Sequence, residues 1–219
     1  MDAPSFRPNG WLRAVVFDYG GVLSLLPTPD DWKKLAGTVK IPLAVLFSCY
    51  WEFREPYDRA EYGGRTYWRR IAAAGGRQLD DNEADRLIAL DNAQWIRENR
   101  PAIDLARRLP GIGLRTAILS NMQFEMLARM RAAFAWLDQF NVQLYSCELG
   151  IAKPQPEIFL HAVRRLGVEP EEALFLDDRE VNLEGAARVG MRTMKYEAPG
   201  SQTALHDLML SCGIDVVTQ

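Results

Sequence analysis

The stretch "AVVFDYGGVL", residues 14–23, joins a short apolar run to an aspartate and two glycines. An apolar run that stops abruptly at polar residues is typical of a strand covered on both faces, as in parallel sheets. Asp18 therefore follows such a strand at the point where glycine makes the backbone flexible. Taken alone, Asp-x-Gly-Gly also fits a plain turn in which the carboxylate accepts backbone hydrogen bonds. Residues elsewhere in the chain decide between a turn and a chemical role.

The same strand pattern returns later in the chain, in "TAILSN" (116–121) and "ALFLDD" (173–178). Between them we predict helices over roughly 123–138 and 155–167, separated by a further strand in "NVQLYSC" (141–147). Strands that alternate with helices in this order are typical of an α/β fold. We therefore predict a core built on a doubly wound, Rossmann-like parallel sheet.

The segment from about residue 26 to residue 99 contains helical patterns and no convincing strand. Its first predicted helix begins in "TPDDWKKLAG", with Thr28 as the N-cap and Pro29 at the first helical position. We therefore predict an α/β core formed by residues 1–25 plus 100–219, and a helical-bundle cap, residues 26–99, inserted after the first strand.

The predicted cap is rich in tryptophan and tyrosine. Trp51, Phe53, Arg54 and Tyr57 could touch a substrate, but aromatic side chains in a helical bundle more often fill its core. We expect these aromatic side chains to lie in the core of the bundle.

Composition excludes several classes of protein. The 219 residues are 48% hydrophobic, and the net charge of −3 comes from mixed acidic and basic residues, without the basic stripe that binds nucleic acid. Cys49, Cys147 and Cys212 are few and far apart, which favours reduced thiols in the cytoplasm. The sequence has neither a secretory leader pattern nor an apolar run long enough to cross a bilayer. We expect no membrane partner, and either a monomer or a homodimer.

Polar residues follow each predicted strand, and the carboxyl ends of parallel strands meet at one crevice. Asp177 and Asp178 would repel each other without a cation, which favours a metal site, whereas a helix N-cap would explain only one of them. Ser120 and Asn121 precede a helix, where they could hold phosphate oxygens or simply cap that helix. We expect these four residues and Asp18 to converge.

Four motifs, "FDYGGVL", "ILSN", "GIAKPQPEIF" and "LFLDDREVNLEGAARVGM", resemble in order the four motifs of the haloacid dehalogenase-like (HAD) hydrolase superfamily. The inserted helices resemble its C1 cap. The resemblance implies a Mg²⁺-dependent phosphatase that hydrolyses a small phosphorylated metabolite. An aspartate nucleophile divides such a hydrolysis into two easier steps through an aspartyl-phosphate intermediate.

The resemblance also implies a role for each matching residue. Asp18 is the expected nucleophile, and Lys153 is expected to neutralise the nucleophile and the transferred phosphoryl group. Mg²⁺ prefers oxygen ligands, which the resemblance assigns to the side chains of Asp18 and Asp178 and to the carbonyl of Gly20. Two further sets complete the expectation: Ser120, Asn121 and Lys153 for phosphate binding, and Asp177 and Asn182 for the surroundings of the metal.

Gly20 departs from the pattern of the superfamily, because phosphatases usually carry there a second aspartate that protonates the leaving group. General acid-base catalysis contributes about 10²- to 10⁴-fold, so glycine predicts slow hydrolysis, substrates with better leaving groups, or an acid from elsewhere. A 2-haloacid dehalogenase, in which Asp18 attacks carbon without a metal, also lacks that aspartate, although its fourth motif does not resemble "LFLDD". A weakened binding or regulatory module is the third alternative.

The two histidines do not support a serine-histidine hydrolase. His161 falls within a predicted helix, and His206 lacks a neighbouring nucleophile motif. Gly185 and Gly190 do not follow a strand, so we expect them to serve helix packing and helix termination instead of phosphate binding.

Overall fold

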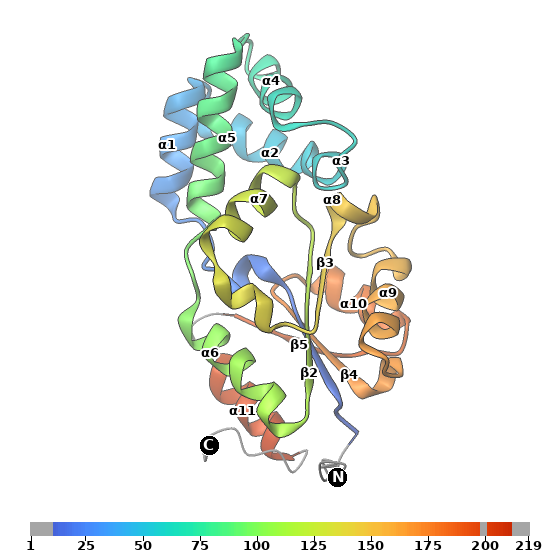
Figure 1. Ribbon diagram of the computed structural model, residues 1–219. Coiled ribbons are helices and arrows are strands. Elements are labelled where there is room, and N and C mark those ends of the chain that lie inside the picture. The colour runs from blue at the N-terminus through green and yellow to red at the C-terminus, as the bar shows by residue number, and fades with distance from the viewer. Residues whose placement is uncertain (1–10, 198–200, 212–219) are drawn as a thin grey trace.

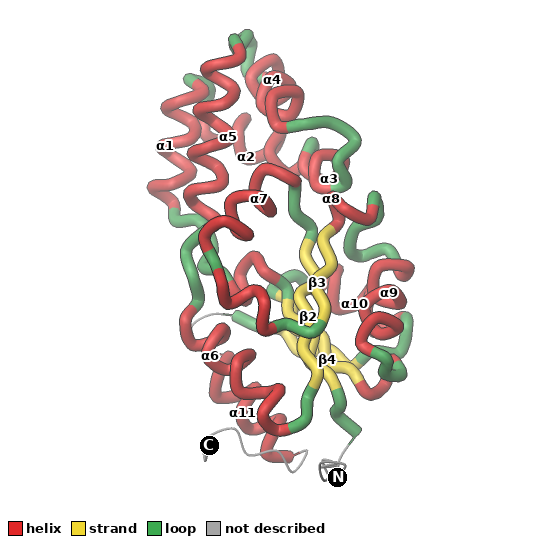
Figure 2. Tube along the Cα trace, in the orientation of Figure 1, coloured by secondary structure: helices red, strands yellow, loops and turns green. Residues whose placement is uncertain are grey.

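The structure, a computed structural model, describes residues 11–197 and 201–211. The predicted ends of the core, residues 1–10 and 212–219, and with them Cys212, lie outside the described residues. Two parts are visible in Figure 1: a bundle of helices in the upper half, and below it a sheet flanked by helices. Figure 2 shows that the strands all lie in the lower part.

The sheet contains five parallel strands in the order β3-β2-β1-β4-β5. This arrangement confirms the predicted α/β fold with a helical insertion after the first strand. The central strand β1 carries Asp18 directly after its last residue, so the aspartate stands at the middle of the sheet's carboxyl edge. The strands are β1 Ala14–Phe17, β2 Arg115–Ser120, β3 Val142–Tyr145, β4 Ala173–Asp177 and β5 Arg192–Lys195.

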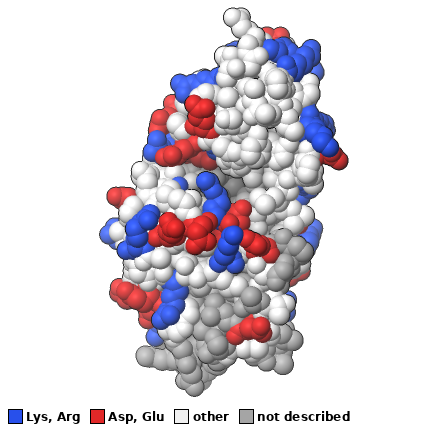
Figure 3. All heavy atoms as spheres, turned by 180° about the vertical axis from the view of Figure 1, so that it is seen from behind, with Lys and Arg blue, Asp and Glu red and all other residues white. Residues whose placement is uncertain are grey.

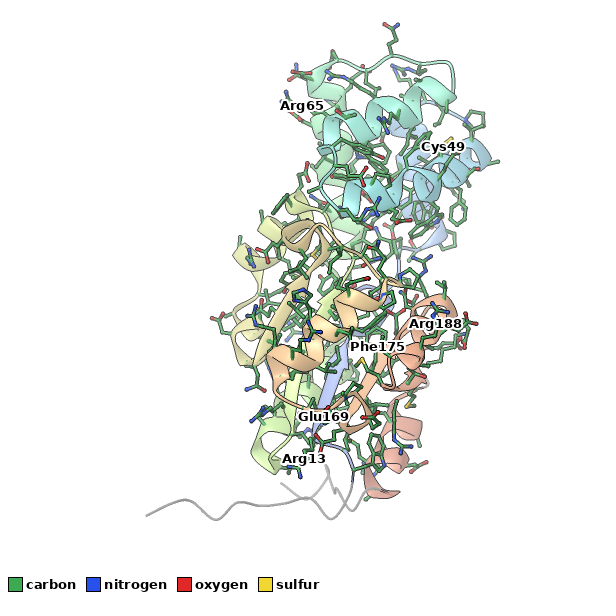
Figure 4. All side chains as sticks on the ribbon, turned by 90° about the vertical axis from the view of Figure 1, so that its right-hand side faces the viewer. Arg13, Cys49, Arg65, Glu169, Phe175 and Arg188 are labelled. Carbon is green, nitrogen blue, oxygen red and sulfur yellow. The ribbon has the colours of Figure 1, made fainter. Side chains whose placement is uncertain are left out.

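Helices cover both faces of the sheet, which explains why β1 is apolar throughout. Val15 and Phe17 face the cluster formed with α6, α7 and α11, whereas Ala14 and Val16 face the cluster formed with α9 and α10. Phe175 of β4 lies inside the core (Figure 4), edge-on to Phe159 at 5.4 Å between ring centres. The core helices are α6 Arg100–Arg108, α7 Phe124–Ala133, α8 Ser146–Leu149, α9 Pro156–Leu166, α10 Glu180–Arg188 and α11 Ser201–Ser211.

The inserted bundle has a hydrophobic core of its own, centred on Tyr50, Tyr67 and Trp68. Its first helix begins as predicted: Thr28 is the N-cap and forms a capping box with Asp31. In Figure 4 Cys49 and Arg65 mark this upper part of the molecule. The helices of the bundle are α1 Pro29–Val39, α2 Leu43–Glu52, α3 Arg54–Asp58, α4 Gly64–Ala74 and α5 Asp81–Trp95.

The two connections between core and bundle run side by side. Ser24 and Glu98 form an antiparallel bridge, and the backbone N–H of Leu25 donates to the carbonyl of Arg97 at 2.7 Å. Asn99 adds a side-chain hydrogen bond to the carbonyl of Val22 at 2.7 Å. The two chain connections therefore form one short hydrogen-bonded ladder, and the proposed domain boundary inside it stays a prediction.

One local prediction is wrong, and one strand was not predicted. The helix expected over 123–138 ends at Ala133, because the backbone of Phe134 is extended and a 3₁₀ turn, Ala135–Gln139, follows. This break lets Trp136 stack on Phe134 and enter the core. Strand β5 escaped prediction because this edge strand is only partly buried and lacks an apolar run.

Within residues 11–197 and 201–211, every helix is too short or too polar to cross a bilayer.

Candidate active site

Asp18 begins a tight turn, η1 Tyr19–Leu23, at the end of β1. Its Oδ1 accepts a hydrogen bond from the backbone N–H of Tyr19 at 2.6 Å, as a turn aspartate would. Gly21 has a φ of +75°, and a Cβ on it would lie 2.8 Å from Cγ of Asp178. Glycine at position 21 therefore supplies both the left-handed backbone and the close approach of a second carboxylate.

Lys153 connects Asp18 to Asp177. Its Nζ lies 2.8 Å from Asp18 Oδ1 and 2.7 Å from Asp177 Oδ2, and the residue is only 3% exposed. Burial disfavours the charge of this lysine, but the two carboxylates outweigh burial and raise the pKa of Lys153. The ammonium group is therefore held in its charged form beside the predicted nucleophile.

Asn121 fixes the position of that lysine. Its amide Nδ2 donates to the backbone carbonyl of Lys153 and its Oδ1 accepts from the Lys153 N–H, both at 2.8 Å. The predicted phosphate role of Asn121 stays a prediction, because the structure shows its amide bound to the loop that carries Lys153. Ser120, predicted as its partner in phosphate binding, is buried and lines the cavity described below.

Asp177 is fully buried and organises the fourth motif. Its oxygens accept hydrogen bonds from Nδ2 of Asn182 at 3.0 Å and from the backbone N–H of Arg179 at 2.9 Å. These contacts hold the start of α10 against the sheet and keep Asp177 paired with Lys153. Asp177 therefore compensates the charge of Lys153 and positions Asn182 from beneath the surface of the site.

Asp18, Asp177 and Asp178 form a carboxylate cluster in which one oxygen from each lies within 4.8 Å of the others. Burial, opposed by Lys153 and reinforced by the other two carboxylates, raises the pKa of Asp18 to about 8. Burial and the charge of Asp177 raise the pKa of Asp178 to about 6. The protein alone therefore disfavours full ionisation of this cluster, and a cation would favour it.

A cavity of about 510 Å³ opens above these groups, between the core and the inserted bundle. Its floor brings together the predicted site residues of the core: Asp18, Ser120, Asn121, Lys153, Asp178 and Asn182. Its other wall comes from the bundle and includes Trp32, Phe47, Trp51, Arg54, Asp58 and Trp95. This volume suits a small-molecule ligand.

The sequence profile of the haloacid dehalogenase-like hydrolases matches residues 12–190, most of the chain. The chain belongs to this family of hydrolases. A phosphatase of Mycobacterium tuberculosis is 31% identical over 200 residues, which are 86% of this chain and 89% of that protein. An (S)-2-haloacid dehalogenase of Burkholderia cepacia is 33% identical over 100 residues, covering 46% of this chain and 43% of that enzyme.

Other relatives are larger proteins. Bifunctional epoxide hydrolase 2 of Sus scrofa is 28% identical over 223 residues, which are 94% of this chain but 40% of that protein. The chain spans 9% to 40% of the length of four mammalian relatives that it matches.

A solved HAD family enzyme of Bacteroides thetaiotaomicron, in complex with magnesium and inorganic phosphate, has a TM-score of 0.68 to this chain. It is 22% identical, with 89% of this chain and 98% of that one covered. At this identity the likeness shows the fold alone.

The donor set of this HAD-like hydrolase fits a magnesium ion. The carboxylates of Asp18 and Asp178 offer the hard oxygen ligands that Mg²⁺ prefers, and the carbonyl of Gly20 stays the predicted third protein ligand. Beside them the buried Oδ1 of Asn182 has no hydrogen-bond partner. An unpaired buried oxygen is costly, so a cation or its hydration water would satisfy it.

A second buried cation, Arg54, was named from the sequence only as a residue that could touch a substrate, and it lines the cavity. Its Nε pairs with Asp58 Oδ1 at 2.8 Å, and one of its terminal nitrogens donates to Gln123 Oε1 of the core at 2.8 Å. The other terminal nitrogen contacts the Tyr50 hydroxyl and lies 3.5 Å from Asp91 Oδ2. The spacing of Arg54 and Asp58, four residues apart in the chain, could have indicated this pair.

The expectation that the cap aromatics fill the bundle core is wrong for Trp51. Tyr57 is 2% exposed and lies in that core, with Phe53 packed against it, whereas Trp51 is 40% exposed and lines the cavity. Neither histidine lines the cavity: His161 is exposed on α9, and His206 is on α11.

The two glycines of the fourth motif have the predicted structural roles. Gly185 packs against Pro154, whose carbonyl would lie 2.8 Å from an added Cβ, and Gly190 follows α10 with a φ of +94°.

Proposed function

We propose that this HAD-like hydrolase is a Mg²⁺-dependent phosphatase that acts on a small phosphorylated metabolite through an aspartyl-phosphate intermediate. The observation that carries the proposal is the carboxylate cluster with Lys153 against Asp18 at 2.8 Å, open to a ligand-sized cavity. A nucleophile needs negative charge, whereas its phosphate substrate is itself an anion. The pairing of Asp18 with a buried ammonium group meets both requirements.

Each residue of the floor has a separate task in the proposed reaction. Asp18 attacks phosphorus, and Lys153 offsets the negative charge that gathers on the nucleophile and the phosphoryl oxygens. Asn121 holds the backbone of Lys153, and Asp177 holds its ammonium group. Bound by Asp18, Asp178 and the Gly20 carbonyl, Mg²⁺ would add positive charge at the phosphoryl oxygens.

Because residue 20 is glycine, hydrolysis of the aspartyl-phosphate is the slow step of the proposed reaction. Hydrolysis of an aspartyl-phosphate requires a water to lose a proton as it attacks, and glycine cannot accept that proton. The loss of general base catalysis slows this step by about 10²- to 10⁴-fold. The phosphorylated form of Asp18 should therefore accumulate during turnover.

Dehalogenation is the second candidate, and Gly20 together with the Burkholderia cepacia relative favours it. The carboxylate cluster argues against dehalogenation. Displacement of a halide from carbon needs no metal ion, so it would not explain why three carboxylates lie together. A binding module without catalysis gives no physical reason for the contacts of Lys153 with both Asp18 and Asp177.

The test is to trap the intermediate. The protein is mixed with phenyl phosphate and Mg²⁺, quenched in acid, digested and analysed by mass spectrometry. We expect one phosphoryl group on the peptide that contains Asp18, and an unmodified peptide in Asp18→Asn. Release of phosphate with the Asp18 peptide unmodified at every quench time would contradict the covalent route. Release of halide from 2-chloropropionate, without phosphate release from any ester, would favour dehalogenation.

A further inference from the structure

The space beside Gly20 is filled by an indole ring. A Cβ on Gly20 would lie 3.3 Å from Cζ3 and 3.7 Å from Cε3 of Trp95, so any side chain at position 20 would start in tight contact with the ring. Hydrogen bonds hold Trp95 in this place: its Nε1 donates to the Tyr50 hydroxyl at 3.0 Å, and its carbonyl accepts from the Tyr19 hydroxyl at 3.2 Å. The position two residues after Asp18 therefore borders a fixed aromatic ring.

Trp95 belongs to a continuous set of rings over the cavity, which we call the aromatic roof: Trp32, Phe47, Trp51 and Trp95. Between ring centres, Trp51 lies 6.4 Å from Trp95 and 6.4 Å from Phe47, and Phe47 lies 5.3 Å from Trp32. Phe47 is 47% exposed and Trp51 is 40% exposed. On the face seen in Figure 3 much of the surface over the cap is free of charged side chains. Exposed aromatic area that joins a ligand cavity indicates a binding surface.

Two arginines lie near the roof. Arg54 pairs with Asp58 and contacts Asp91, so its charge is compensated inside the protein. Arg179 lies over the Trp51 ring, with its guanidinium carbon 5.8 Å from the ring centre. The roof offers ring faces to the part of the substrate above the phosphate, and Arg179 lines the cavity beside Trp51.

We propose that the substrate is a phosphate monoester of a phenol, with its ring against the aromatic roof and its phosphate facing Asp18; this inference rests on the phosphatase activity proposed above. Two independent features lead to it. The roof favours a flat, aromatic leaving group. Glycine at position 20 supplies no general acid, and the Trp95 ring lies beside it, which favours leaving groups that depart as anions.

The chemistry of phenols meets this restriction. A phenol ionises at a pKa of about 10, far below the pKa of water, which aliphatic alcohols resemble. Asp18 forms a bond to phosphorus while the bond from phosphorus to the phenolic oxygen breaks and leaves its electron pair on that oxygen. The phenolate then takes a proton from solvent. Water attacks phosphorus next, the bond to Asp18 breaks, and the carboxylate and inorganic phosphate are released.

Three esters separate the two features: phenyl, benzyl and cyclohexylmethyl phosphate. Phenyl and benzyl esters share the ring but differ in the leaving oxygen, so we expect kcat/KM to be about 10²-fold or more higher for phenyl phosphate. Benzyl and cyclohexylmethyl esters share the leaving oxygen but differ in the ring. As inhibitors of phenyl phosphate hydrolysis, we expect the benzyl ester to bind about 2- to 10-fold more tightly, the range for an aromatic contact.

A matched pair of variants tests the roof. Phe47→Leu removes a ring that lines the cavity, and Phe124→Leu removes one that is 51% exposed but lies outside the cavity lining. We expect Phe47→Leu to raise KM for phenyl phosphate about 2- to 10-fold with little change in kcat, and Phe124→Leu to change neither. Phenylphosphonate, which cannot be hydrolysed, should quench tryptophan fluorescence less in Phe47→Leu than in the native protein.

The outcomes distinguish this inference from the proposed function. Hydrolysis of cyclohexylmethyl phosphate as fast as phenyl phosphate would overturn the phenol assignment and leave a phosphatase. Equal KM values and equal quenching in Phe47→Leu and Phe124→Leu would overturn the role of the roof. Failure to release phosphate from all three esters with Mg²⁺ present would overturn the proposed function, and this inference with it.

Discussion

Two buried cations, Lys153 in the core and Arg54 in the cap, show how similar ion clusters can serve different ends. Lys153 is 3% exposed and contacts Asp18 and Asp177. A third carboxylate, Asp178, completes the cluster within 4.8 Å. Three acids face one base on the floor of the cavity, so the core cluster carries surplus negative charge.

In the cap cluster, neutral side chains take part in the hydrogen bonds around the charged groups. Besides its contacts with Asp58 and Asp91, Arg54 donates to Tyr50 and Gln123. Tyr50 and Gln94 donate to Asp91 in turn, at 2.8 and 2.9 Å. Donors from α2, α3 and α5 thus bind these carboxylates, and Gln123 of the core accepts from Arg54.

The two clusters differ in how fully the charges of their carboxylates are compensated. The three carboxylates of the core cluster share one ammonium group and need a further cation. In the cap cluster, part of which also lines the cavity, two carboxylates share Arg54, and Asp91 has two neutral donors as well. We therefore propose catalysis and metal binding for the core cluster, and attachment of the cap to the core for the Arg54 cluster. Each of the following changes tests one side of this assignment.

Replacing Lys153 with Met should have the largest effect. It removes the only positive charge of the core cluster in the described structure, so we expect kcat for an aryl phosphate to fall about 10³-fold. Lys33→Met is the control, because Lys33 makes an exposed pair with Asp30. Activity within tenfold of native in Lys153→Met would contradict the role of this cation.

Replacing Arg54 with Leu should act on stability instead. It leaves Asp58 and Asp91 buried without their cation, and we expect urea denaturation to show a loss of about 3 kcal/mol. Arg65→Leu, which breaks exposed pairs with Asp81 and Asp85, should cost less than about 1 kcal/mol. Isothermal titration should detect Mg²⁺ binding in both variants. Loss of Mg²⁺ binding in Arg54→Leu alone would show that the two clusters are not separate.

Replacing Asp178 with Asn should change the response to pH and metal. Burial raises the pKa of Asp178 from its ordinary 3.8 to about 6, so its ionisation destabilises the metal-free fold as pH rises through this range. The stabilising contribution is complete below 3.8 and lost above about 6. We therefore expect Asp178→Asn to raise the metal-free melting temperature at pH 8 but not at pH 4, and to abolish stabilisation by Mg²⁺. Native-like stabilisation by Mg²⁺ in this variant would exclude Asp178 as a ligand.

Replacing Asn121 with Ala should have the smallest effect. Two hydrogen bonds to the backbone of Lys153 are lost, each contributing about 1 kcal/mol, so kcat should fall about tenfold or somewhat more. KM should change little, because the amide acts through Lys153. A raised KM with unchanged kcat would instead support the phosphate contact predicted from the sequence.

The residues on the floor of the site could be predicted because the ends of buried strands can be recognised in the sequence. Asp18, Ser120 and Asp177 each follow or end an apolar run, and parallel strands bring such residues together. Lys153 came from the resemblance alone, since its loop position does not reveal that Nζ reaches two carboxylates. Contacts of this kind depend on packing between elements far apart in the chain.

The roof was harder to predict for the same reason. Whether Trp51 fills the bundle core or faces a cavity depends on how α2 is rotated against its neighbours, and both positions suit an aromatic residue on a helix. The Arg54 cluster joins α3 to α5 and to the core, contacts that periodicity within one helix cannot specify. Gly20 could be recognised from the sequence as a departure from the pattern of the superfamily, and the structure shows the Trp95 ring beside it.

The most direct test of the central claim is hydrolysis of 4-nitrophenyl phosphate by the native protein and by Asp18→Asn, each with Mg²⁺ and with a chelator. This leaving group needs no acid, so the measurement isolates the nucleophile and the metal from the missing acid at Gly20. We predict steady release of nitrophenol only for the native protein with Mg²⁺, and at least a 10³-fold loss in the other three cases. Equal rates in native protein and Asp18→Asn, or rates unchanged by the chelator, would contradict the account.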